Sequence, residues 1–178
     1  MENKIIMGGF GGQGIVLAGN ILARAALLEG KNIAGMVSYG AEVRGGTANS
    51  SVIISDEEIF SPVISKANTL FAFNQPSLNK FSKMLSGSGL VVVNTSLIKD
   101  LDAVKEGVKI IKIPATDIAI ELGNVRAANI VAIGAYIKAS GFLKKESVLE
   151  IIEGTFSKKS QELVELNKKA FEKGYNEN

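Results

Sequence analysis

Residues 8–14 read Gly-Gly-Phe-Gly-Gly-Gln-Gly, between a short, mainly apolar run at 4–7 and a long apolar segment with the pattern of a helix. Five glycines in seven residues form a loop with almost no side chains, so a ligand can approach the backbone closely. The first turn of the following helix offers unpaired N–H groups and the positive end of the helix dipole, which favour an anion such as phosphate. The stretch therefore predicts a strand, a loop able to bind an anion, and a helix.

The same loop matches the G-x-G-x-x-G pattern of dinucleotide-binding folds at Gly9, Gly11 and Gly14. Such a fold needs an acidic residue at the end of the second strand, about 20 residues further on, to bind the ribose hydroxyls. The second predicted strand ends without one, and the nearest acids are Glu29 before it and Glu42 after it. A P-loop is excluded because no Gly-Lys-Ser/Thr follows the glycines. A classical hydride-transfer dehydrogenase is therefore disfavoured.

Two interpretations of the glycine loop stay open. In the first, the glycines only form a tight turn between strand and helix, and Gly14 allows close helix packing. In the second, the loop faces a phosphate or diphosphate, Gln13 adds a side-chain donor, and Phe10 packs against or beside the ligand. The candidate ligand-binding residues of the loop are Gly9, Phe10, Gly11, Gly12, Gln13 and Gly14.

A second candidate cluster follows the second predicted strand, and it contains Tyr39, Glu42, Arg44, Gly45 and Gly46. If the first two strands are neighbours in a parallel sheet, this cluster lies beside the glycine loop, because the carboxyl ends of such strands share one crevice. An arginine next to exposed backbone N–H groups can bind phosphate or carboxylate. Alternatively, Glu42 and Arg44 form an ion pair that holds the loop, or they contact a partner subunit.

The hydrophobic pattern predicts an α/β fold, with a mainly parallel, Rossmann-like open sheet, an antiparallel hairpin insertion and a helical C-terminus. Residues 1–178 are expected to form one domain. The predicted strands are 3–8, 32–38, 47–55, 68–73, 89–94 and 108–113, with a short hairpin arm at Ile59–Pro62. The predicted helices are 13–29, 75–85, 115–122, 124–140, 145–153 and 158–173.

Two of the predicted helices are apolar almost all round. Between Ile15 and Leu28 only Asn20 and Arg24 are polar, and between Ala127 and Ile137 only Asn129 and Tyr136 are. A helix that lies on a sheet needs one apolar stripe, so the excess predicts a second cover from a neighbouring helix or a partner chain. The second of these helices is rich in Ala and Gly, which permits close approach of another backbone.

Composition restricts the chemistry that the chain can perform alone. There is no Cys, so thiolates cannot hold an iron–sulfur cluster, and no His, so the commonest general base and metal ligand is missing. A net charge of +2 with dispersed lysines gives no argument for nucleic acid binding. The sequence has neither a membrane-spanning apolar run nor a signal segment, so we expect a cytoplasmic protein.

Taken together, the two clusters identify a family. The segments 9–19, 38–46 and 50–55 resemble those of the gamma subunit of 2-oxoacid:ferredoxin (acceptor) oxidoreductases, and the resemblance extends over essentially the whole chain. Phe10 before the glycines and Glu42-Val-Arg44-Gly-Gly resemble the 2-oxoglutarate or branched-chain 2-oxoacid type more than the pyruvate type. Ala41 is a small departure, since proline is frequent there in such subunits.

The resemblance implies a subunit of an enzyme that converts a 2-oxoacid and coenzyme A (CoA) to acyl-CoA and CO2. In such complexes alpha and beta subunits carry thiamine diphosphate with Mg, and iron–sulfur clusters pass electrons to ferredoxin, often through a ferredoxin-like delta subunit. The gamma subunit itself binds no redox cofactor or metal and holds no catalytic residue, so the isolated chain is expected to be inactive. Its lack of Cys and His agrees with that role.

In multidomain relatives the corresponding domain lies near the path of CoA, so the resemblance implies that the two clusters border a site for CoA phosphates. The expected substrate is 2-oxoglutarate, with pyruvate, a branched-chain 2-oxoacid or indolepyruvate as alternatives. A stand-alone nucleotide- or CoA-binding module is the alternative of another class. Without its partners the subunit is expected to self-associate, because it would expose its partner-facing helices as large apolar patches.

Overall fold

A computed structural model describes residues 1–39 and 47–177. Its centre is a six-stranded sheet in the order β2-β3-β1-β4-β5-β6. The strands are β1 (Glu2–Phe10), β2 (Asn32–Tyr39), β3 (Thr47–Ser55), β4 (Ala67–Ala72), β5 (Leu85–Asn94) and β6 (Lys109–Ile113). The helices are α1 (Ile15–Leu28), α2 (Gln75–Phe81), α3 (Ala115–Glu121), α4 (Ala128–Ser140), α5 (Lys145–Phe156) and α6 (Gln161–Asn176), with short 3-10 turns η1 (Ser82–Met84) and η2 (Val125–Ala127).

The predicted fold class is confirmed. Strands β1, β4, β5 and β6 are parallel, whereas β3 runs antiparallel to both of its neighbours, β1 and β2. Successive side chains of a strand point to opposite faces of the sheet. In the central strands both sets are apolar, as a sheet covered on both sides requires. In β1, for example, Ile5 and Met7 contribute to one core, and Ile6 contributes to the other.

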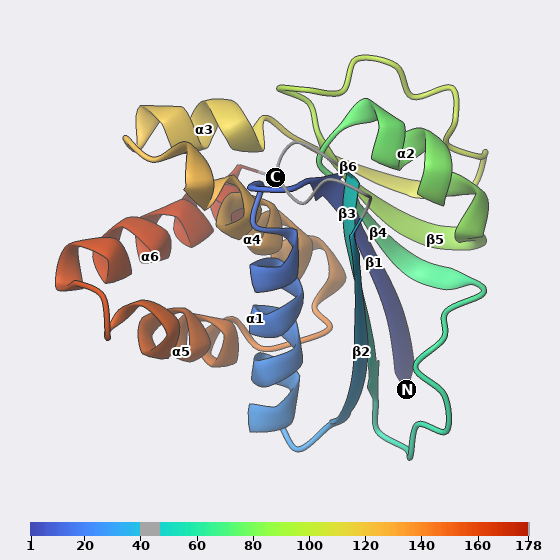
Figure 1. Cartoon of the computed structure of the whole chain (residues 1–178), viewed down its shortest axis with the longest axis horizontal. Helices are drawn as coiled ribbons and strands as arrows, with labels where there is room; N and C mark the ends of the chain where they lie inside the picture. Colours follow the sequence, from blue (N-terminus) through green and yellow to red (C-terminus); the bar gives the residue numbers. More distant parts are fainter. Residues whose placement is uncertain (40–46, 178) are drawn as a thin grey trace.

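The two faces of the sheet carry unequal layers (Figure 1). Helix α2 covers one face, whereas α1 and α4 cover the other and α5 and α6 form a further layer outside them (Figure 1). The helix that follows β1 and the helix that follows β4 therefore lie on opposite faces. The chain changes face between these two neighbouring strands, which is where open α/β sheets form a crevice at their carboxyl ends.

The predicted hairpin arm at Ile59–Pro62 is wrong, because these residues form no strand. Strand β3 already has β1 on one side and β2 on the other, so it offers no free edge to a returning arm. Pro62 also lacks the N–H that a ladder would need. The preceding residues are held differently, since the Asn32 side-chain amide donates to the Glu57 carbonyl at 3.1 Å.

Helix α4 is covered by helices of its own chain. Every residue from Ala128 to Ile137 is buried, and the helix packs on α6, α3 and α1 as well as on β5 and β6. This answers the question of its second cover in favour of neighbouring helices. Its two polar side chains, Asn129 and Tyr136, both have hydrogen-bond partners. The Asn129 amide donates to the Gly14 carbonyl, and the Tyr136 hydroxyl accepts from the Asn3 amide at 2.7 Å. Burial raises the pKa of Tyr136 to about 12, so the phenol is neutral.

The predicted close approach at this helix is also confirmed. A Cβ added at Gly134 of α4 would collide with the Phe171 carbonyl oxygen of α6, and one added at Gly174 of α6 would collide with the Val131 carbonyl oxygen of α4. The two backbones are therefore in direct contact at reciprocal glycines. Within the described ranges, no helix has both the length and the apolar character needed to cross a membrane.

Candidate functional site

The glycine loop lies at the carboxyl end of β1, where it is closed by its own glutamine. The Gln13 N–H donates to the Phe10 carbonyl at 3.2 Å, and the Gln13 Oε1 accepts from the Phe10 N–H at 2.7 Å. Its Nε2 donates to the Phe73 carbonyl at the end of β4, at 3.4 Å. The side chain that sequence analysis assigned to a ligand thus also ties the loop to the neighbouring strand.

Helix α1 begins at Ile15, two residues later than predicted, because Gly14 has a left-handed φ of 73°. The first helical hydrogen bond runs from Ala18 N–H to the Gly14 carbonyl at 2.9 Å, and no side chain caps this end. The N–H groups of the first turn therefore have no partner within the helix. The Asn129 amide of α4 donates to the same Gly14 carbonyl at 2.9 Å, which fixes α4 against the loop.

Packing and backbone conformation explain more of the glycines than the sequence suggested. A Cβ at Gly8 would lie 2.8 Å from the Ser77 Cβ, one at Gly9 would lie 2.7 Å from the Gln13 Oε1, and one at Gly14 would lie 2.5 Å from the Asn129 Nδ2. Gly12 has a φ of 101° and open space around it. The turn interpretation therefore accounts for four glycines, and the ligand role of the loop stays a prediction.

A pocket of about 430 Å³ opens at the start of α1. It is lined by Phe10, Gly11, Gly12, Gly14, Ile15, Val16, Leu17, Tyr39, Ala48 and Arg126. Among these lining residues there is one cation and no carboxylate. Positive potential from Arg126 and from the helix end acts on a pocket whose walls are otherwise apolar or glycine, which favours an anion.

The second predicted cluster is brought to this pocket in part. The condition that the first two strands are neighbours is not met, because β3 lies between β1 and β2. Tyr39 pairs with Ala48, and Ala48 pairs with Gly9, so Tyr39 still reaches the edge that carries the glycine loop. The other members of the cluster, Glu42, Arg44, Gly45 and Gly46, lie outside the described residues.

Arg126 is a site residue that the sequence did not predict. It lies in η2, directly before α4, and its N–H donates to the Asn124 side chain at 3.1 Å. The predicted helix 124–140 begins two residues before Arg126, so the position of Arg126 near a helix start could be predicted. Arg126 lies more than a hundred residues from the glycine loop in the sequence. That the fold brings the two together could not be predicted from the sequence.

A second pocket, of about 250 Å³, lies on the other side of the loop. It is lined by Gly12, Gln13, Phe73, Leu97, Thr116, Val125, Arg126 and Ala128. Its polar lining residues are Gln13, Thr116 and Arg126. Thr116 is held in place, since its hydroxyl accepts from the Asn94 amide at 2.8 Å. Gly12 and Arg126 belong to both pockets.

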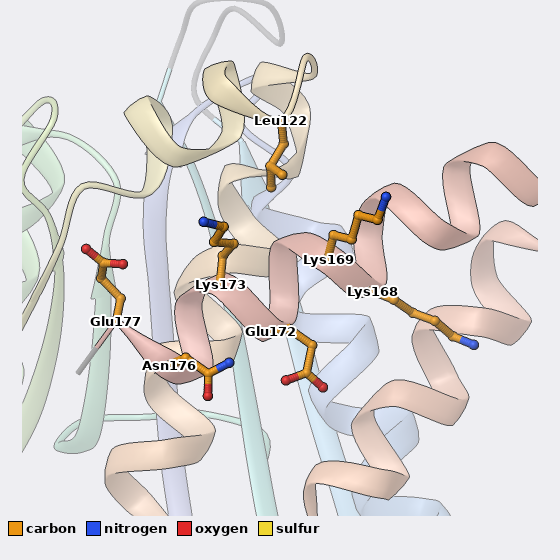
Figure 2. A pocket seen from close by; sticks show the side chains of 7 residues that line it. All are labelled: Leu122, Lys168, Lys169, Glu172, Lys173, Asn176 and Glu177. Carbon is orange, nitrogen blue, oxygen red and sulfur yellow. The ribbon is translucent and has the colours of Figure 1, made fainter.

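A larger pocket of about 510 Å³ lies along α6 (Figure 2). Its lining mixes three lysines with Glu172 and Glu177. Lys168 pairs with Glu153 at 2.6 Å, and Glu172 pairs with Lys145 at 2.8 Å, so charges here are already partly balanced. We therefore place the candidate site at the glycine loop. Residues 1–39 and 47–177 contain no group of three His, Cys, Asp or Glu side chains able to hold a metal ion.

Comparison with known proteins decides the family. A family model described as pyruvate ferredoxin/flavodoxin oxidoreductase matches residues 4–177. The chain belongs to this family. Its resemblance to the gamma subunit is confirmed, since it is 37% identical over 155 residues to the common gamma subunit of pyruvate/ketoisovalerate oxidoreductases of Thermococcus litoralis, covering 84% of each chain.

Other members of the family differ in length and in the substrate given in their names. The chain is 38% identical over 177 residues to the 2-oxoglutarate synthase subunit KorC of Methanocaldococcus jannaschii, covering 98% of this chain and 93% of the relative. It is 39% identical over 175 residues to the ketoisovalerate oxidoreductase subunit VorA of Methanothermobacter marburgensis, covering 97% of this chain and 36% of VorA. The gamma-type chain therefore spans about a third of that longer relative.

A solved relative shows the same arrangement of elements. The 2-oxoglutarate:ferredoxin oxidoreductase of Magnetococcus marinus, with 2-oxoglutarate, coenzyme A and succinyl-CoA bound, superposes with a TM-score of 0.89 at 26% identity. The superposition covers 97% of this chain and 30% of that one. The gamma-type unit thus occurs both as a separate chain and as part of a larger one.

Proposed function

We propose that this chain is the non-redox gamma subunit of a complex that oxidatively decarboxylates 2-oxoglutarate and transfers the acyl group to CoA. The products are acyl-CoA and CO2, and the electrons pass to ferredoxin. Partner alpha, beta and ferredoxin-like delta subunits supply thiamine diphosphate with Mg and the iron–sulfur clusters. A chain without Cys or His supports this division of labour, as does the near full-length similarity to KorC.

The choice of substrate belongs to the thiamine-bearing partners in this proposal. Similarity alone does not separate 2-oxoglutarate from ketoisovalerate, since KorC is 38% and VorA 39% identical to the chain. The name of the Thermococcus relative, a common subunit of two oxidoreductases, supports a gamma subunit that does not select the substrate. The assembled complex should give its highest kcat/KM with 2-oxoglutarate when compared with pyruvate, 2-oxoisovalerate and indolepyruvate. A preference for any of the other three would reassign the complex.

The glycine loop is proposed to bind the phosphates of CoA, together with Tyr39 and the segment that contains Glu42, Arg44, Gly45 and Gly46. The observation that carries the proposal is the pocket of about 430 Å³ at an uncapped helix start, lined by Arg126 and by no acid among its described residues. CoA carries several phosphate charges, and its diphosphate and 3′-phosphate match donors of this kind.

Val16 allows a test that leaves the fold in place. It lies in the first turn of α1 and lines the pocket. Val16→Glu puts a carboxylate where the anion should bind, yet an acid in the first turn is favourable for the helix itself. Like charges at close range should weaken CoA binding by the assembled complex roughly tenfold or more, measured by calorimetric titration. Val16→Gln, of the same size but uncharged, should change affinity little, and equal affinities for the two variants would remove CoA from the loop.

Contact with a partner subunit is the competing role of the same loops. Under that alternative Arg44→Ala leaves CoA affinity unchanged and weakens assembly of the complex in size-exclusion runs. A stand-alone nucleotide- or CoA-binding module is the alternative of another class. Purification from the native host separates it from the proposal, because co-purifying Cys-rich chains with brown absorbance support a complex, and their absence supports the module.

The isolated chain is expected to self-associate through the edge strand β2. This eight-residue strand carries no charge, and its Met36, Val37 and Tyr39 are 49%, 45% and 51% exposed. Unprotected edges of this kind tend to pair with other chains. Val37→Lys should therefore shift the isolated subunit toward monomer in sedimentation velocity, whereas Ile120→Lys on α3 should not. A wild-type chain that stays monomeric at high concentration would contradict the expectation.

A further inference from the structure

The two pockets at the glycine loop form two compartments with a shared wall. The larger one, about 430 Å³, and the smaller one, about 250 Å³, have Gly12 and Arg126 in common. A ligand group bound at Gly12 and Arg126 would therefore have space on both sides for the rest of the ligand. A pocket for a terminal phosphate would need room on one side only.

The backbone of Arg126 is held beside the loop by residues around the start of α4. Asn124 fixes its backbone through the 3.1 Å hydrogen bond to the Arg126 N–H, and Asn129, one helical turn further on, holds the Gly14 carbonyl at 2.9 Å. The side chain has no ion-pair partner among residues 1–39 and 47–177. An arginine that lines two cavities is suited to bind phosphate oxygens.

The two compartments differ in chemistry. The larger one has the aromatic side chains of Phe10 and Tyr39 in its wall, which suits a flat base that can stack on a ring. The smaller one is lined by the polar residues Gln13 and Thr116 beside the apolar Leu97 and Val125, which suits a chain with both amide and alkyl parts. CoA has such parts on either side of its diphosphate, with the adenosine at one end and the pantetheine at the other.

We propose that Arg126 binds the internal diphosphate of CoA, with the adenosine in the larger compartment and the first part of the pantetheine chain in the smaller one. This inference rests on the proposed binding of CoA at the glycine loop. It assigns the 3′-phosphate, which is a terminal group, to a position away from Arg126.

The test compares CoA with 3′-dephospho-CoA, which keeps the diphosphate and lacks the terminal phosphate. In the assembled complex Arg126→Gln should raise the KM for both compounds by the same factor, roughly tenfold or more, because a charge-assisted hydrogen bond to phosphate is lost in each case. The kcat should change little. Arg24→Gln, which removes the same charge from the far part of α1 where Arg24 donates to Thr155, should leave both KM values unchanged.

Four results would overturn the inference. A raised KM for CoA alone would place the 3′-phosphate at Arg126, an unchanged KM for both would remove Arg126 from the site, and a fall in kcat alone would indicate a structural role. Arg126→Lys should recover part of the lost affinity for both compounds, and no recovery would also count against phosphate binding. If Val16→Glu leaves CoA binding intact, the glycine-loop site itself fails; if only Arg126→Gln is silent, this inference alone fails.

Discussion

Replacing Gly174 of α6 by alanine is expected to lower the free energy of unfolding by about 3 kcal/mol, because the added methyl group must push two packed helices apart. A Cβ at this position would collide with the Val131 carbonyl oxygen and would lie 2.7 Å from the Val131 carbonyl carbon. These atoms belong to the backbone of α4, which is buried all round and cannot move away from α6 without disturbing the sheet. Urea unfolding of the isolated subunit measures the effect.

Gly154 of α5 provides the matched control. It is also a glycine within a helix, but a Cβ added there meets nothing within 4 Å. Gly154→Ala should therefore stabilise the subunit by about 1 kcal/mol through helix propensity alone. If both variants have the same stability, the direct contact between the α4 and α6 backbones is not the reason for the glycine at 174.

Replacing Gly14 by alanine is expected to destabilise the subunit by about 3 kcal/mol, the sum of a left-handed backbone and a displaced buried amide. Gly14 has a φ of 73°, and its Cβ would lie 2.5 Å from the Asn129 Nδ2. Asn129 is fully buried, so moving it breaks its hydrogen bond to the Gly14 carbonyl where no water can replace it. The loop should lose its position relative to α4, and CoA binding by the assembled complex should fall with it.

Gly30 separates the two causes of this effect. Its φ of 76° is nearly the same, and no atom lies within 4 Å of an added Cβ. Gly30→Ala should cost only the backbone strain, about 1–2 kcal/mol, and should leave CoA binding unchanged. Equal destabilisation of the two variants in urea unfolding would show that the clash with Asn129 contributes nothing.

Much of the fold could be predicted because local signals and packing agree. The apolar runs at 3–8 and 68–73 became the neighbouring parallel strands β1 and β4, and the predicted helix 13–29 is α1, followed by Gly30 with a positive φ. The ends of elements were less predictable. Gly14 delays the start of α1 by adopting a left-handed conformation, and α2 ends at Phe81 with a 3-10 turn in place of its last predicted helical residues.

Strand order could not be derived from local patterns. The second cluster was placed beside the glycine loop on the condition that the first two strands are neighbours. In the structure β3 lies between them and pairs antiparallel with both β1 and β2. The site, too, could be predicted only in part. The glycine loop was found from its composition, whereas Arg126 reaches it only because Asn129 docks the start of α4 on the Gly14 carbonyl.

Hydrogen–deuterium exchange of the assembled complex with and without CoA tests the central claim most directly, because the claim concerns backbone N–H groups. CoA should slow exchange in peptides that cover residues 9–18, where the first turn of α1 has no partners within the helix, and should leave peptides from α5 unchanged. If CoA gives no protection of residues 9–18 under conditions where the complex turns over CoA, that result would contradict an anion site at the glycine loop.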